Sequence, residues 1–315
     1  MSRNSLSQRI CCLAGFVLCS FLSSHAADFV GQEEAGERLI NADLTPKETV
    51  GEMTTKAFRD GSMPAGRIQF SGYTWQVKAS HRYVGPGPNR FSSSTNNVWV
   101  DDEGRLHLRI TKERDEWRCA EVVMEKPVGY GTYRFYSASR IDQLDANVVL
   151  GFFTWDDDTY KSMANCELDI EWARWGDPTA PNLHYSVQPV WGPDEPGGKY
   201  KERSFPRSVE LSETRVLDVF EWRPEAVRFA TYDGHEAVEG KLLAEWRFDE
   251  GNPHRRTQGS GGWTSPVGIP APGPGTRVRI NLWLLDGDRS GRGDAPTDGM
   301  PVEVVIERFE FIPAD

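Results

Sequence analysis

Three acidic residues, Glu167, Asp169 and Glu171, alternate with two aliphatic residues, Leu168 and Ile170. A period of two is typical of a β-strand, on which the three carboxyls share one face and the aliphatic side chains point into a core. Strands are normally depleted in Asp and Glu, so a strand face made of three acids is unusual. The pattern predicts a strand whose acidic face does chemistry.

Two tryptophans, Trp172 and Trp175, follow the acids directly. Apolar rings beside a carboxyl raise its pKa because they remove water from the charged form. A carboxylic acid that stays protonated beside an ionised one is what hydrolysis of a glycosidic bond requires. The sequence therefore indicates acid–base chemistry by paired carboxyls.

The elements that must position these acids are short strands. More than ten segments alternate between apolar and polar residues, and turn signals such as Gly85–Asn89 and Asp101–Gly104 separate them. Segment 148–155 is almost continuously apolar, so we expect it to be buried on both faces. Helical periodicity is nearly absent, which predicts a β-sandwich or barrel. The expected strands are 70–78, 97–100, 105–110, 117–124, 130–136, 148–155, 182–190, 208–220, 226–232, 244–248, 278–285 and 302–311.

The acidic motif resembles the Glu-x-Asp-x-Glu motif of glycoside hydrolase family 16, in the regular spacing of lichenases. Three further stretches resemble that family in the same order: Cys119-Ala-Glu-Val-Val123 with Gly129-Tyr-Gly-Thr-Tyr133, Phe220–Phe229 with Tyr232-Asp-Gly234, and Ile280-Asn-Leu-Trp-Leu284. The resemblance covers 67–313. It implies an all-β, antiparallel jelly-roll sandwich of the concanavalin A type, with a concave sheet that carries a substrate cleft.

The resemblance also implies roles for the acids. Glu167 would be the nucleophile and Glu171 the general acid/base, while Asp169 would hydrogen-bond the nucleophile. Strand geometry puts the Cα atoms of Glu167 and Glu171 about 13 Å apart, so the side chains must lean toward each other. Retention of configuration is therefore implied by the resemblance and not by the spacing.

Further residues are expected to bind sugar. Glu121 stands where the family has a sugar-binding acid, and Asn281 shares a strand face with Trp283, whose ring could stack on a sugar. A core position is the alternative for each tryptophan, and an exposed acid for Glu121. The expected substrate-binding residues are Glu121, Trp155, Trp175, His184, Gln188, Asn281 and Trp283.

The N-terminus resembles a secretory signal. Arg3 and Arg9 precede an apolar run of 13 residues, Ile10–Leu22, and small residues allow cleavage after Ala26. The run is too short for an ordinary membrane span, although an uncleaved anchor is the alternative. We expect a signal peptide at 1–26, an N-terminal extension at 27–66 with a short helix at 33–39, and a secreted or periplasmic protein.

Composition narrows the partners. The formal net charge of −11 argues against nucleic acid and against an anionic membrane surface, and is compatible with a neutral polysaccharide. Strand parity puts Cys119 and Cys166 on opposite faces of the sheet, so we expect no disulfide between them. The six histidines show no paired spacing, and no metal or cofactor is expected from the residues. Members of the family can hold a structural Ca²⁺, which we do not place.

We therefore expect a monomeric, endo-acting glycoside hydrolase that cleaves β-linked polysaccharide. The unbulged motif favours β-1,3-1,4-glucan. The loops at 194–206 and 251–274 differ from the short loops expected of a lichenase and leave the substrate open. A transglycosylase on the same scaffold and a non-catalytic, lectin-like sandwich are the alternatives. Modules that only bind tend to lose one of the three acids, and this chain has all three.

Overall fold

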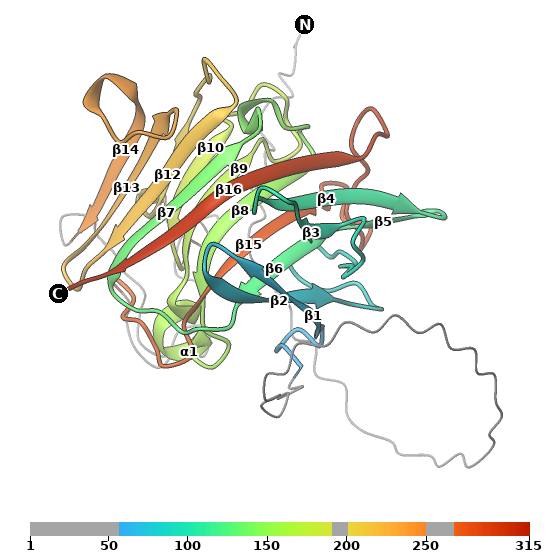
Figure 1. Ribbon diagram of the computed structural model, residues 1–315, viewed down its shortest axis with the longest axis horizontal. Coiled ribbons are helices and arrows are strands. Elements are labelled where there is room, and N and C mark those ends of the chain that lie inside the picture. The colour runs from blue at the N-terminus through green and yellow to red at the C-terminus, as the bar shows by residue number, and fades with distance from the viewer. Residues whose placement is uncertain (1–56, 191–200, 250–267) are drawn as a thin grey trace, which may run out of the picture.

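The computed structural model describes residues 57–190, 201–249 and 268–315. The predicted signal peptide, the predicted helix at 33–39 and most of the predicted extension lie outside the described residues. Two antiparallel sheets pack face to face (Figure 1). The described helices are α1 and four short 3₁₀ segments, and none is long and apolar enough to cross a membrane. Their bounds are Tyr160–Met163 for α1, and Ile141–Gln143, Ala164–Cys166, Lys201–Arg203 and Glu239–Lys241 for the 3₁₀ segments.

The first sheet, here the front sheet, carries the acidic motif on β9. Its strand order is β1-β2-β6-β15-β8-β9-β10-β11. Neighbours in this order are far apart in the sequence, so side chains from distant segments meet on one face. The bounds are Met63–Phe70 (β1), Tyr73–Ala79 (β2), Ala120–Met124 (β6), Arg277–Leu284 (β15), Val148–Trp155 (β8), Leu168–Ala173 (β9), Leu183–Val187 (β10) and Ser204–Arg207 (β11).

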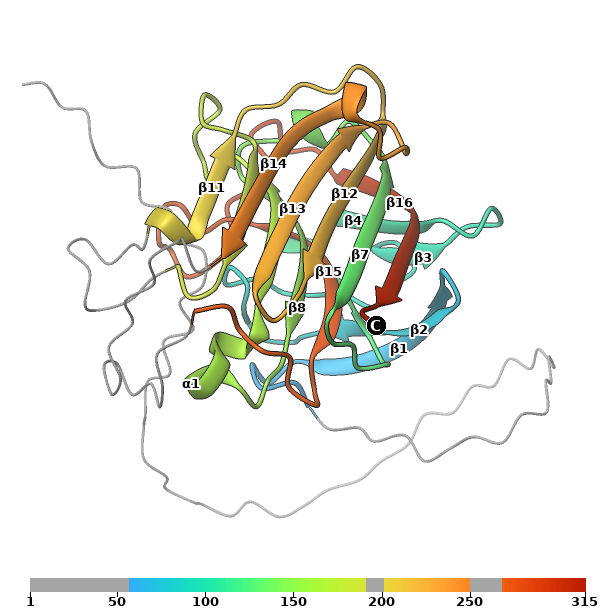
Figure 2. The same ribbon diagram turned by 90° about the vertical axis from the view of Figure 1, so that its left-hand side faces the viewer.

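The second sheet, here the back sheet, has the order β14-β13-β12-β7-β16-β4-β3, with β5 paired to β4. Figure 2 shows β14, β13, β12, β7 and β16 side by side in one layer. The bounds are Leu242–Asp249 (β14), Ala226–Asp233 (β13), Arg215–Trp222 (β12), Gly131–Ala138 (β7), Val302–Pro313 (β16), Leu106–Glu113 (β4), Val98–Val100 (β3) and Glu116–Arg118 (β5).

The core lies between the two sheets. Leu168, Ile170 and Trp172 of β9 are fully buried there, and Phe152 of β8 stacks on Phe135 of β7 with ring centroids 4.6 Å apart. Strand β8 lies between β15 and β9 and is buried along most of its length, as its apolar run predicts. The predicted all-β antiparallel sandwich is confirmed.

Three strand boundaries in the structure differ from the predicted ones. Strand β1 begins at Met63, inside the predicted extension. The predicted strand 117–124 is divided, because β5 pairs with β4 and β6 joins the front sheet. The predicted strand 208–220 begins at Arg215.

Cys119 and Cys166 are free thiols, whose Sγ atoms donate to Asn89 Oδ1 at 3.3 Å and to Ala271 O at 3.0 Å.

Candidate active site

Strand β9 pairs with β8 and β10 without a register shift. Glu171 lies opposite Gly151 of β8 and His184 of β10, and in the adjoining row Asp169 lies opposite Phe153 and Ser186. Glu167 precedes β9 with extended backbone (φ −91°, ψ 122°). The three acids therefore project from the outer face of the front sheet, as the alternation predicts. The motif carries no bulge.

Asp169 and Glu167 form a hydrogen-bonded carboxyl pair. Burial raises the pKa of Asp169 to about 7, against the opposing effect of hydrogen bonds from Gln188 and Glu167. Burial also raises the pKa of Glu167 well above its ordinary value, and the negative charges of Asp169 and Glu171 add to this while Arg279 opposes it. Two carboxyls that interact this closely titrate as a unit. The raised pKa values of both carboxyls favour one proton shared between them.

This shared proton gives the pair two chemical states. With the proton on Asp169, the ionised Glu167 accepts a hydrogen bond and can act as a nucleophile. With the proton on Glu167, the same group is an acid. The amide of Gln188 holds Asp169 in place, because Nε2 donates to Asp169 Oδ2 at 3.0 Å and Oε1 accepts from the Val190 amide at 2.9 Å. Gln188 was expected to bind substrate, and its observed contacts are to Asp169 and the backbone.

Arg279 is a site residue that the sequence analysis missed. It lies on β15 opposite Phe153, which in turn lies opposite Asp169. The residue is 7% exposed, and its positive charge lowers the pKa of Glu167 against the effect of burial. The alternation of side chains along a strand could have identified it, since Arg279 stands two residues before Asn281 and therefore shares its strand face.

Glu121 is completely buried on the same face. Its Oε1 pairs with Arg279 Nη1 at 3.2 Å and its Oε2 with Lys78 Nζ at 3.0 Å. Both carboxylate oxygens are therefore used by cations of the protein. A direct role of Glu121 in sugar binding remains a prediction.

Asn281 of β15 lies opposite Glu121 of β6 and Gly151 of β8. Gly151 in turn lies opposite Glu171 of β9. Its Oδ1 is buried and has no hydrogen-bond partner among the described residues. A Cβ at position 151 would stand only 2.5 Å from that oxygen, so Gly151 provides the space for it. An unpaired buried acceptor costs free energy, and a hydroxyl donor from a ligand would remove that cost.

The three tryptophans that were expected to stack on sugar lie in two separate parts of the structure. Trp155 is half-buried and donates from Nε1 to Asp157 Oδ1 at 2.8 Å. Trp175 packs against His184 and Trp283, with ring centroids at 5.7 Å and 6.2 Å. Trp175 is 8% and Trp283 4% exposed, so these rings offer little area for stacking. Their platform role remains a prediction.

Trp172 does not flank the acids, contrary to the sequence-based expectation. It follows Glu171 and therefore projects from the inner face of β9, where its Nε1 donates to Asp218 Oδ2 at 2.9 Å. The expectation used nearness in sequence, whereas strand parity separates neighbouring side chains by the thickness of the sheet.

One group of carboxylates could attract a cation. Among the described residues, only Asp286, Asp288 and Asp294 bring three possible ligand atoms within 4.8 Å of one another. They lie in the loop after β15, outside the acidic motif. Exposed acidic clusters are common without a metal, and this one by itself does not define a metal site.

No protein-family model matches the sequence, and no curated protein matches it. Several solved structures are similar to the chain. A glycosyl hydrolase family protein from Mycobacterium fortuitum has a TM-score of 0.50 at 19% identity, covering 84% of this chain and 100% of its own. An immunostimulatory antigen and pseudo β-1,3-glucanase of Mycobacterium tuberculosis has a TM-score of 0.51 at 18% identity, covering 76% of this chain and 91% of its own.

The chain shares its fold with these proteins. A Bacillus licheniformis β-glucanase is also similar, with a TM-score of 0.48 at 17% identity over 80% of this chain and 99% of its own. At such identities the likeness establishes the sandwich, and the chemistry must be argued from the site.

Proposed function

We propose that the protein is a glycoside hydrolase of the family 16 type that cleaves β-linked polysaccharide with retention of configuration. The observation that carries this proposal is the hydrogen-bonded pair of half-buried Glu167 and buried Asp169 on one strand face with Glu171. Such a set of carboxyls in unlike protonation states is what double displacement at a sugar carbon needs.

In this mechanism Glu167 attacks the anomeric carbon while Glu171 protonates the leaving oxygen. A covalent glycosyl-enzyme results. Glu171 then removes a proton from water, which attacks the same carbon and releases Glu167. Asp169 keeps Glu167 ionised by carrying the proton that the pair shares, and Gln188 holds Asp169.

The substrate class follows from the site and from what the similar structures are named for. A glycosyl hydrolase and a pseudo β-1,3-glucanase share this fold, which supports a β-glucan. The unbulged spacing of the acidic motif favours β-1,3-1,4-glucan among these. Asn281 Oδ1 supplies a buried acceptor for a sugar hydroxyl. We further propose that the protein acts as a monomer after export to the periplasm or the medium.

A reducing-sugar screen across lichenan, laminarin, xyloglucan, agarose and carrageenan tests the proposal. The wild type should release reducing ends from at least one β-glucan, and Glu167→Gln, which keeps the shape of the side chain, should release none. Products longer than the substrate would identify the transglycosylase alternative. Binding to a glucan column without any release of reducing ends would replace the proposal with the lectin-like alternative.

A further inference from the structure

Residues Phe58–Ser62 form a compact turn just before β1, here the N-terminal turn. The Phe58 amide donates to Ser62 O at 2.9 Å, and the Gly61 amide donates to Phe58 O at 2.8 Å. Asp60 Oδ1 accepts from the Ser62 amide at 2.8 Å. Gly61 has φ +81°, a conformation that side chains disfavour. These bonds fix the turn relative to the strand that follows it.

One end of the N-terminal turn is tied to β2. Asp60 Oδ2 pairs with Lys78 Nζ at 2.9 Å, and the Lys78 side chain is only 1% exposed. Lys78 also donates to Gly85 O at 2.7 Å and pairs with Glu121 on the outer face of the front sheet. A buried ammonium needs such partners. The turn therefore completes the surroundings of a charge that belongs to the acidic face.

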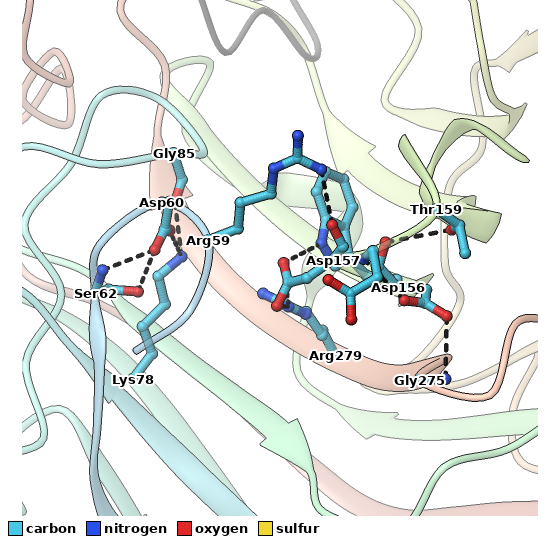
Figure 3. A network of polar contacts seen from close by, with 12 residues as sticks. Arg59, Asp60, Ser62, Lys78, Gly85, Asp156, Asp157, Thr159, Gly275 and Arg279 are labelled. Atoms are coloured by element: carbon cyan, nitrogen blue, oxygen red, sulfur yellow. Dashed lines mark hydrogen bonds and ion pairs between the residues drawn. The ribbon is translucent and has the colours of Figure 1, made fainter. Parts of the chain in front are cut away.

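The other end reaches across the sheet to the loop after β8. The Arg279 guanidinium carbon lies 5.3 Å from the centroid of the Phe58 ring, and Phe58 is 7% exposed. Arg59 Nη1 donates to Asp157 O at 2.8 Å. Figure 3 shows Arg59 between the Lys78–Asp60 pair and Asp157. The N-terminal turn thus bridges β2 and the β8 loop above β15.

This bridge stands where a bound sugar chain would run. In the proposed mechanism the carboxyls of Glu167 and Glu171 flank the scissile bond, and because they are separated along β9 the sugar chain between them would cross the strands. On one side of β9 it would pass over β8, β15, β6 and β2. Strand spacing puts β15 about 10 Å and β2 about 19 Å from β9. Phe58 and Asp60 occupy that interval.

We propose that the N-terminal turn is an end wall that sets how many sugar units bind on the β15–β2 side of the acids. This rests on the proposed function and sharpens it. The path is closed on this side, so the polysaccharide enters with a chain end there and the released piece has a short, fixed length. The wall therefore departs from the endo-acting mode expected from the sequence, in which a path open at both ends would release pieces of many lengths.

Product analysis tests the wall. β-Glucan oligosaccharides of increasing length, labelled at the reducing end, are digested with wild type, with the double variant Phe58→Ala/Asp60→Ala, and with Met63→Ala. Met63 is 41% exposed and lies just outside the turn, which makes it the matched control. Wild type and control should release one short piece at every substrate length. The double variant should release longer pieces as well, several-fold more often. Identical product patterns in all three proteins would overturn the proposal.

A second readout does not depend on hydrolysis. Acetylation of lysines followed by mass spectrometry reports whether the N-terminal turn covers Lys78, and the exposed Lys126 serves as the internal control. Lys78 should be protected in wild type and become at least several-fold more reactive in the double variant. Unchanged reactivity of Lys78 would contradict the wall even if the products change. If wild type cleaves no glucan while Lys78 reacts as expected, the proposed function is wrong and the turn does not limit sugar binding. The finding that the turn covers Lys78 would still hold.

Discussion

Two buried aspartates lie on the two sides of β9 and resemble each other in one property. Asp169 projects from its outer face, and Asp218 of β12 contacts its inner face through Trp172. Burial raises the pKa of both carboxyls to about 7. A raised pKa alone would mark both as candidates for chemistry.

The two aspartates differ in the side chains that they hydrogen-bond. Asp218 accepts hydrogen bonds from the Trp172 indole and the Thr231 hydroxyl, and Tyr185 Oη donates to Thr231 in turn at 2.7 Å. No second acid takes part in the pKa shift of Asp218, whereas a hydrogen bond with Glu167 takes part in the pKa shift of Asp169. The comparison teaches that burial raises a pKa in either place, and that a second carboxyl within hydrogen-bond reach is what makes a site for proton exchange.

The largest expected effect is on the outer face. Glu167→Ala should lower kcat by at least about 10⁴-fold, because no covalent sugar can form. Azide could fill the vacated space, so it should rescue this variant and yield an α-glycosyl azide by a single displacement. Glu171→Ala with an activated leaving group should give a β-azide through the glycosyl-enzyme. The same anomer from both variants would break the role assignment, and full activity of Glu167→Ala would show that Glu167 is not the nucleophile.

Trp283 tests whether a position on the outer face implies function. Its ring is 4% exposed and packs against Trp175, so Trp283→Ala should lower the free energy of unfolding by about 3–5 kcal/mol. Denaturant unfolding measures this, with Trp155→Ala at a half-buried ring as the comparison. A variant that keeps its stability and shows a higher KM would instead support the sugar platform expected from the sequence.

The proton sharing between Asp169 and Glu167 is the next target. Asp169→Asn removes a negative charge beside Glu167, which should lower the pKa of Glu167 and shift the acidic limb of the kcat/KM profile to lower pH. We expect kcat to fall by about 10²-fold, since the amide cannot exchange a proton with Glu167. Asp218→Asn is the matched control and should leave both the limb and kcat in place. An unshifted limb in Asp169→Asn would argue against a shared proton.

Much of this arrangement could be predicted from the sequence. The period of two placed Glu167, Asp169 and Glu171 on one face, and the turn signals gave most of the strands, although β1 and β11 were missed and β5 and β6 were taken as one. Local patterns of this kind depend on the chain's own geometry and need no tertiary information. The same parity argument, applied further along β15, would also have reached Arg279.

Other features depend on which strands become neighbours. Asp218 lies 46 residues from its partner Trp172, and nothing in either segment shows that β12 packs behind β9. The N-terminal turn was hidden for a different reason. A polar stretch with few apolar residues resembles a linker, and only its contacts with distant residues, such as the ion pair between Asp60 and Lys78, show that it packs against the front sheet.

The smallest effect concerns the inner face and its dependence on pH. The folded-state pKa of Asp218 lies near 7, above the ordinary value of 3.8, so the folded protein binds the proton more tightly than the unfolded chain does. The cost of ionising the buried group is absent at low pH and grows as the pH rises from 3.8 to about 7. Asp218→Asn has no charge to bury.

Relative to wild type, Asp218→Asn should therefore gain about 2–3 kcal/mol of unfolding free energy between pH 5 and pH 8, since one unit of pKa corresponds to about 1.4 kcal/mol. Urea unfolding at the two pH values measures the difference, and kcat should not change at either. The sign is decisive: a variant whose stability relative to wild type falls with rising pH would mean that Asp218 is stabilised as a carboxylate by Trp172 and Thr231. In that case the two aspartates of the comparison would differ in charge as well as in neighbours.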